Sequence, residues 1–364
     1  MPEVKAKIAR LREYLKAEEL DGIVLQTRDN FAWVTGGGDN HVVSQSETGV
    51  AALYITARQA VLIANTIEEP RLTAEEPVAA FTVKSHPWTT PMAEAVAKQV
   101  GKKKVVCDVP CGLGLDPLPA SFYELRAALT DEEVKRYKAL GRDCAMIVET
   151  VARGMNIGDS GHQVEAELAR HLLARGIQPH VLLVAFDDRL RKYRHPTPTV
   201  NHLRHYAMLV VCGRRYGLIA NLTRLLHFGP VPADIKERHH AVCRVEAALW
   251  QHTLPGKAYG EVLQAGIEQY KKEGFAKEWQ LHHQGGPTGF TGRDFLVTPD
   301  ETRPVVDGQA VAWNPSIAGA KNEDTFILQG EERLVVTACS KNWPQQEIAM
   351  PGGFRIKRPG ILER

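Results

Sequence analysis

The chain has 364 residues, of which 44% are hydrophobic and 24% are charged, and its formal net charge is +2. This composition is typical of a globular protein with a substantial core and excludes an intrinsically disordered chain. A nearly balanced charge, with no long basic run beyond residues 102–104, argues against a nucleic-acid partner. The length indicates two domains, or one large one.

The cysteines and the N-terminal residues indicate the compartment. Six cysteines are scattered at positions 107, 111, 144, 212, 243 and 339, and none forms a C-x-x-C pair. This usage favours reduced thiols and a cytoplasmic location. The first fifteen residues are charged and amphipathic, unlike a signal peptide, and no apolar run is long enough for a membrane helix. We expect no membrane partner.

The first third of the chain alternates between helical and strand patterns. Val4, Ile8, Leu11 and Leu15 recur at helical spacing and predict one apolar helix face. A Pro/Gly-rich passage at 109–119 leads toward a linker helix. We predict a small α/β domain over residues 1–127. Its other expected elements are strands at 22–25, 50–55, 59–64 and 104–107, a helical turn at 30–35 and a helix at 91–100.

The remainder, residues 128–364, predicts an α+β domain with a mostly antiparallel sheet. Thr130 and Glu133 form a capping box that begins a helix running to about Arg153. A glycine-containing break precedes a second helix over 162–175. The later pattern predicts strands at 181–186, 207–212, 216–226, 310–314, 324–328 and 333–337, with helices at 233–254 and 259–273.

Five short motifs follow one another in the second part of the chain. They are R-H-P-T-P-T at 194–199, A-N-L-T-R at 220–224, H-H-Q-G-G at 282–286, N-P at 314–315 and N-E-D-T at 322–325. In this order they resemble the creatinase/aminopeptidase P/prolidase superfamily, peptidase family M24. The resemblance covers nearly the whole chain and implies a creatinase-like N-terminal domain followed by a pita-bread catalytic-type domain. It also implies a homodimer in which one subunit's N-terminal domain borders the partner's active site.

The resemblance also implies a dinuclear metal centre held by two Asp, one His and two Glu. In this sequence the first Asp position falls on Val210 or Cys212, depending on the direction of counting, and the second is Asn221. The ligand histidine position falls on Gly286, although His282 or His283 could still reach the site. Asn314 replaces the first Glu, and Glu323 alone is unchanged.

One formal negative charge therefore remains where the family has four. Two dications facing one carboxylate would be poorly compensated in a partly desolvated cleft. We predict that the dinuclear centre is absent and that the protein uses no metal or other cofactor.

The retained residues still suggest chemistry. His195 occupies the position of the superfamily's proton-shuttling histidine, and its ordinary pKa suits proton transfer near neutral pH. Its alternative is a surface histidine beside prolines. Glu323 could bind a cationic group or act as a base, rather than being an exposed loop acid. His282 and His283 lie in a glycine-rich loop, and we expect one of them to line the cleft.

Five further residues are candidates for substrate binding. Arg293, in a G-R-D turn, could grip a carboxylate, or instead pair with Asp294 or Glu301. Asn221 and Asn314 could recognise a polar group, or be remnants of a lost site. Cys212 could be a nucleophile, although an inert buried cysteine is the plainer interpretation. Tyr193 precedes the R-H-P motif and could shape the pocket.

Three functions follow from this pattern. The leading hypothesis is a metal-independent, creatinase-like hydrolase of a C–N bond in a small polar substrate. A second is a catalytically inactive homologue that binds a small molecule or short peptide. The third is a metal-dependent Xaa-Pro aminopeptidase or prolidase, which the lost ligands disfavour.

Overall fold

The computed structural model describes residues 2–109 and 114–364, so part of the Pro/Gly-rich passage lies outside the described residues. The chain forms two compact units. The first comprises 1–126 with 216–218, and the second comprises 127–215 with 219–364. The domain boundary after residue 127 remains a proposal.

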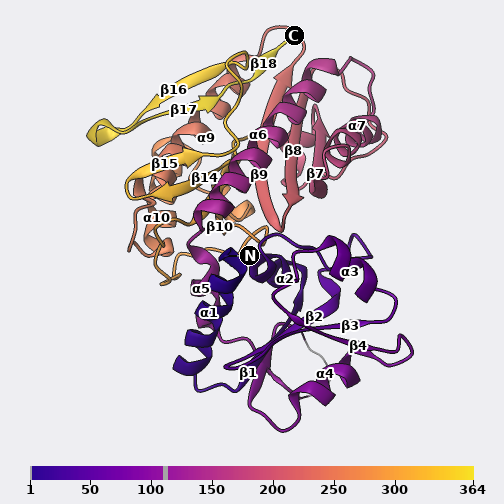
Figure 1. The fold of residues 1–364 in the computed structure, drawn as a ribbon. Coiled ribbons are helices and arrows are strands. Elements are labelled where there is room, and N and C mark those ends of the chain that lie inside the picture. The colour runs from indigo at the N-terminus through magenta and orange to yellow at the C-terminus, as the bar shows by residue number, and fades with distance from the viewer. Residues whose placement is uncertain (1, 110–113) are drawn as a thin grey trace. The chain divides into compact units, whose positions relative to one another are not determined.

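The first unit is a mixed six-stranded sheet with helices, as the α/β prediction required (Figure 1). Val4, Ile8, Leu11 and Leu15 of α1 are all buried, which confirms the predicted apolar face. The sheet order is β4-β3-β2-β1-β5-β6. The strands are β1 (Gly22–Thr27), β2 (Thr48–Thr56), β3 (Ala60–Asn65), β4 (Thr82–His86), β5 (Val105–Cys107) and β6 (Asp116–Pro117). The helices are α1 (Pro2–Ala17), α2 (Arg28–Thr35), α3 (Glu69–Glu75), α4 (Met92–Val100), η1 (Ala120–Tyr123) and α5 (Glu124–Ala127).

The second unit begins with two capped helices, α6 (Asp131–Gly154) and α7 (Gly161–Leu173). The predicted capping box is present, because the Thr130 Oγ1 accepts from the Glu133 amide at 3.3 Å while Glu133 Oε2 accepts from the Thr130 amide at 2.7 Å. A second capping box, formed by Ser160 and Gln163, begins α7.

A four-stranded sheet in the order β18-β9-β8-β7 follows these helices. Its strands are β7 (Gln178–Phe186), β8 (Tyr206–Arg215), β9 (Leu218–His227) and β18 (Leu362–Glu363). Tyr216 and Gly217 connect β8 to β9 with φ values of 56° and 79°. A two-residue hairpin turn of type I′ requires positive φ at both of its central residues. The long strands β8 and β9 are buried along nearly their whole length.

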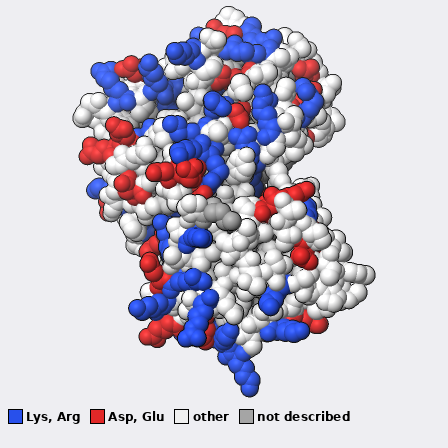
Figure 2. Space-filling model, in the orientation of Figure 1, with Lys and Arg blue, Asp and Glu red and all other residues white. Residues whose placement is uncertain are grey.

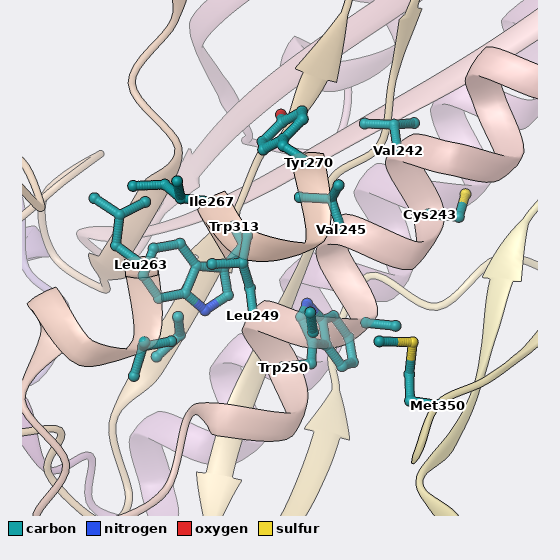
Figure 3. Packing of buried hydrophobic residues seen from close by; sticks show 14 of the residues in the cluster. Val242, Cys243, Val245, Leu249, Trp250, Leu263, Ile267, Tyr270, Trp313 and Met350 are labelled. Carbon is teal, nitrogen blue, oxygen red and sulfur yellow. The ribbon is translucent and has the colours of Figure 1, made fainter. Parts of the chain in front are cut away.

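The second sheet of this unit has the order β10-β11-β14-β15 and packs against two long helices. These are α9 (Ala233–His252) and α10 (Tyr259–Lys272), with β10 (Gly285–Thr288), β11 (Ala310–Trp313), β14 (Asp324–Gln329) and β15 (Glu332–Val335). Figure 3 shows Trp250, Leu249 and Trp313 within the shared core. The Trp313 indole N–H donates to Thr253 Oγ1 at 2.9 Å, which satisfies its polar atom inside that core.

Several short elements were not predicted from the sequence. They include the antiparallel pair β16 and β17, whose exposed charged residues carry no clear apolar alternation. The elements are α3, β4, β6, α8 (Arg189–Lys192), η2 (Glu278–Leu281), β10, β12 (Ser316–Ile317), β13 (Ala320–Lys321), β16 (Gln345–Ala349), η3 (Pro351–Gly353), β17 (Arg355–Pro359) and β18.

The surface charges and the hydropathy of the helices agree with the nearly balanced composition of the chain. Basic and acidic side chains are interspersed on the face shown in Figure 2. Among the described residues, no helix is both long and apolar enough to cross a bilayer.

Candidate active site

The second unit contains a cavity of about 330 Å³ that is lined by strands and loops of its two four-stranded sheets. Strands β7, β8 and β9 supply one part of its wall, and loops next to β10, β11 and β14 supply the rest. A volume of this size suits a small molecule or a short peptide. The lining residues are His180, Val181, Leu183, His195, Val210, Cys212, Asn221, His283, Gly292, Arg293, Asn314, Lys321 and Glu323.

Glu323 is buried in this wall with both carboxylate oxygens engaged. Its Oε2 accepts from Lys321 Nζ at 2.6 Å and from Thr223 Oγ1 at 3.0 Å, while Oε1 accepts from Arg293 Nη2 at 3.0 Å. Burial alone would raise the pKa of this carboxyl, but the charges of Lys321 and Arg293 outweigh it and lower the pKa to about 2. Glu323 is therefore an ionised, fully occupied acceptor at neutral pH.

Lys321 is a site residue that the sequence motifs did not single out. It ends β13, is only 4% exposed, and lies two positions before Glu323. In extended chain, side chains two residues apart lie on the same side, so the K-N-E spacing offered a signal. Lys321 and Arg293 together give the cavity two cations against one carboxylate.

Asn221 and Asn314 each present a buried oxygen at the cavity. The Asn221 Nδ2 donates to Thr288 Oγ1 at 3.1 Å, and its backbone N–H donates to Thr325 Oγ1 at 2.9 Å. Within the described parts of the chain, Asn221 Oδ1 and Asn314 Oδ1 have no hydrogen-bond partner although both are buried. Buried acceptors of this kind are normally satisfied, so they are suited to receive N–H or O–H groups of a ligand.

Three histidines gather at one side of the cavity. His195 and His283 line it, whereas His282 is buried and does not. Of the two adjacent histidines, His283 is therefore the one that faces the cavity. His282 Nε2 lies 3.1 Å from His195 Nε2, and His282 Nδ1 lies 3.0 Å from Ser316 Oγ.

All three imidazoles are held in the neutral form. Burial, reinforced by the nearby charge of Lys321, lowers the pKa of His195 and of His282 below the usual value. Burial and the charge of Arg293 lower the pKa of His283 to about 4. At neutral pH each ring therefore has one nitrogen lone pair available to accept a proton.

Both candidates for the first family Asp position, Val210 and Cys212, line the cavity from β8. They share a side because strand residues two apart point the same way. Burial, together with the charge of Glu323, raises the pKa of the Cys212 thiol to about 12. A thiol in this state is a poor nucleophile, so the inert buried cysteine is the better interpretation.

The structure differs from what the sequence suggested for Arg293 and Tyr193. Arg293 pairs with Glu323, so the alternative of an ion pair with Glu301 is wrong, and Glu301 pairs instead with Arg303. Arg293 Nη1 also donates to the Gly292 carbonyl at 2.6 Å. Tyr193 does not line the cavity and is 51% exposed, with the Arg189 guanidinium over its ring.

The donor set does not fit the dinuclear centre that the resemblance implies. Four of the five ligand positions hold Val210 or Cys212, Asn221, Gly286 and Asn314, none of which supplies an anionic oxygen or an imidazole. The fifth, Glu323, already has a cation on each oxygen. Two further dications would add to an excess of positive charge in a buried site.

Other polar residues support the site and were not singled out from the sequence. Thr223, Thr288 and Thr325 hold Glu323 and Asn221 through hydroxyl hydrogen bonds. Ser316 holds His282 and accepts from Arg194 Nη1 at 3.2 Å. Single hydroxyl residues in strands carry no sequence signal that separates such a role from ordinary β preference.

Comparison with solved structures gives the same architecture. The Xaa-Pro dipeptidase from Bacillus anthracis has a TM-score of 0.77 at 17% identity, over 93% of this chain and 99% of its own. The prolidase from Pyrococcus horikoshii OT3 has a TM-score of 0.80 at 14% identity, over 93% and 99%. The N-terminal domain of FACT complex subunit SPT16 from chickpea, Cicer arietinum, has a TM-score of 0.70 at 12% identity, over 93% and 97%. The TM-scores establish a shared fold.

Family models identify both parts of the chain, whereas no curated protein sequence matches it. The model of the Creatinase/Prolidase N-terminal domain matches residues 7–147, and that of Metallopeptidase family M24 matches residues 135–338. The predicted fold class and family are thereby confirmed. The chain belongs to metallopeptidase family M24 and carries a creatinase/prolidase-type N-terminal domain.

Proposed function

We propose that this protein hydrolyses a C–N bond in a small polar substrate without the dinuclear metal centre of its family. One observation carries the proposal. Lys321 and Arg293 occupy both oxygens of Glu323, the single retained ligand, while the imidazole of His195 borders the same cavity. The charge that metals would supply is thus replaced by side-chain cations, and a proton carrier is still present.

His195 is the residue that we assign to proton transfer. In the neutral form its ring accepts a proton from water as the water oxygen attacks the carbon of the C–N bond. The same ring then donates that proton to the leaving nitrogen as the C–N bond breaks. His282, 3.1 Å away, is positioned to share the proton with His195 and to hold its orientation.

The cavity favours a substrate that carries an anionic group. With its histidines neutral, the lining has two cations and one carboxylate. Lys321 and Arg293 would attract a carboxylate, and the free oxygens of Asn221 and Asn314 would accept from N–H groups. An N-substituted or guanidino amino acid combines these features, and a short peptide does so at its C-terminus.

Glu323 receives a different role from the one expected. A carboxylate whose oxygens accept from two cations and a hydroxyl is a weak base, so we assign it to holding Lys321 and Arg293 in place. Homodimeric assembly and a cytoplasmic location remain proposals. They rest on the resemblance and on the scattered cysteines, and sedimentation of the purified protein tests the first.

A substrate screen with a chelator present tests the proposal. It would cover N-acyl, N-carbamoyl and guanidino amino acids and Xaa-Pro dipeptides, with release of amine, ammonia or urea as the readout. We expect chelator-resistant turnover that His195→Gln abolishes and that His162→Gln, a change at an exposed histidine on α7, leaves intact. Turnover only of Xaa-Pro peptides, and only with added Mn²⁺ or Co²⁺, would establish the metal-dependent peptidase instead. Ligand binding without turnover would establish the inactive homologue.

A further inference from the structure

Three histidine rings from two separate segments converge at the edge of the cavity. His195 lies between α8 and β8, and His282 and His283 lie between η2 and β10. Their ligand atoms all fall within 4.8 Å of one another. We propose that His195, His282 and His283 form a mononuclear site for a transition-metal cation of the Zn²⁺, Co²⁺ or Ni²⁺ class.

The ring-centre distances and the one nitrogen–nitrogen contact are close to those of a three-imidazole site, and the ligand atoms as a set lie within 4.8 Å of one another. With metal–nitrogen bonds of about 2.0–2.1 Å and tetrahedral angles, neighbouring ligand nitrogens lie roughly 3.4 Å apart and ring centres roughly 5 Å apart. Here the Nε2 atoms of His195 and His282 are 3.1 Å apart. The three ring-centre distances are 4.8, 4.9 and 5.6 Å.

The orientation of His282 favours a ligand at its Nε2 atom. Its Nδ1 lies 3.0 Å from Ser316 Oγ, which accepts from Arg194 as well. A ring whose second nitrogen bonds a neighbouring group is the usual arrangement of a ligating histidine. When the His282 Nδ1–H donates to Ser316, the Nε2 lone pair faces Nε2 of His195, and either an N–H···N hydrogen bond or a shared cation joins the two nitrogens.

His283 supplies an independent observation. Its Nδ1 atom is buried and has no hydrogen-bond partner among the described residues. A cation shared by all three rings would satisfy this buried nitrogen, since each ring offers a ligand atom within 4.8 Å of the other two. Because His195 and His283 line the cavity and His282 does not, the fourth coordination position would open toward the cavity.

The surrounding charges determine which ion is favoured. Lys321 and Arg293 repel a dication, and they also help to keep the imidazoles neutral, which is the form that ligates. Neutral imidazoles suit Zn²⁺, Ni²⁺ and Cu²⁺, whereas Mg²⁺ and Mn²⁺ prefer anionic oxygens. This selectivity is opposite to that of a carboxylate-rich dinuclear centre, and none of the three histidines falls on one of the family's ligand positions.

Titration calorimetry with ZnCl₂ on the metal-free full-length protein tests the site. The absorption spectrum of the Co²⁺-loaded protein reports the ligand geometry. We expect one ion per chain and a tetrahedral-type Co²⁺ spectrum. His195→Gln and His283→Gln, which change rings at the cavity surface, should each weaken Zn²⁺ binding at least about tenfold, and Ser316→Ala should weaken it by about 10-fold through the orientation of His282.

Two controls locate the ion. His162→Gln removes an exposed histidine and should leave binding unchanged. Cys212→Ser removes a cavity-lining thiol, a common Zn²⁺ ligand that lies outside the histidine cluster, and Zn²⁺ binding should survive it. Absence of stoichiometric Zn²⁺ binding, or binding that tolerates both His195→Gln and His283→Gln, would overturn the proposal. Since the readout is binding, failure here is distinguishable from failure of the proposed hydrolase, which Zn²⁺ at His195 would inhibit.

Discussion

The Lys321 ammonium lies 2.6 Å from Glu323 Oε2, where the family's peptidases are expected to hold a metal ion. Arg293 takes the other oxygen at 3.0 Å, so a Lys–Glu–Arg cluster stands in a buried position. The cluster keeps the carboxylate ionised without any metal. On the proposed function, these two side-chain cations take over the charge that metal ions would supply.

Glu323→Gln should destabilise the protein by about 3–5 kcal/mol, because the change leaves Lys321 and Arg293 buried without their anionic partner. Urea unfolding measures this difference. Glu332→Gln on β15, an exposed position, is the matched control and should change stability by less than about 0.5 kcal/mol. Adding Lys321→Met to Glu323→Gln should recover part of the loss. Equal stability of wild type and Glu323→Gln would contradict the cluster's role.

The pH dependence of turnover should report the environment of His195. Burial and the charge of Lys321 lower its pKa below 6.5, so the neutral, proton-accepting form persists below that pH. We expect the acid limb of kcat/KM to lie below pH 6.5. Lys321→Met should move this limb upward, since it removes a cation that lowers the pKa. A limb that stays in place in Lys321→Met would show that another group titrates.

Acid should destabilise the fold partly through His239 on α9. Burial, with the charges of His240 and Arg358, lowers the pKa of His239 from 6.5 to about 3, and Gln346 Nε2 lies 3.2 Å from its Nδ1. The folded protein excludes a proton that the unfolded chain accepts below pH 6.5. The contribution of neutral His239 to the free energy of unfolding is therefore complete above pH 6.5. It is lost toward pH 3, by up to about 1.4 kcal/mol per pH unit.

His239→Gln removes this titration and should flatten the decline of stability between about pH 6.5 and about pH 4.5. Urea unfolding at several pH values measures the slope. His162→Gln, at an exposed position, should leave the slope as in wild type. An unchanged slope in His239→Gln would assign the acid sensitivity to other groups.

Cys212 should be chemically inert. Its thiol is buried and its pKa is raised to about 12, so little thiolate is present near neutral pH. We expect Cys212→Ser to retain turnover, and iodoacetamide to label the native protein at Cys212 only as fast as it unfolds. Peptide mass spectrometry measures the labelling. Rapid modification of Cys212 together with loss of activity would revive the nucleophile hypothesis.

Most of the architecture could be predicted because it follows from local patterns. The spacing of Val4, Ile8, Leu11 and Leu15 and the capping box at Thr130 each determine an element by themselves. The β16–β17 pair could not be predicted, since exposed residues such as Gln345 and Arg355 satisfy strand and loop equally well.

The site could be predicted in outline but not in its contacts. Motif positions brought His195, Asn221, Asn314 and Glu323 to one cavity, as expected from the resemblance. The partner of Arg293 is thirty positions away in the chain, and no local pattern identifies it. The choice of His283 over His282 depends on which ring Ser316 holds inward, and that is a tertiary contact.

The most direct test of the central claim is an anomalous-scattering map from crystals grown with excess Mn²⁺. The Lys321–Glu323–Arg293 cluster predicts no manganese peak at Glu323, with the ammonium still against the carboxylate. One or two manganese peaks bonded to Glu323, with Lys321 displaced, would contradict the account. They would support the metal-dependent peptidase function instead.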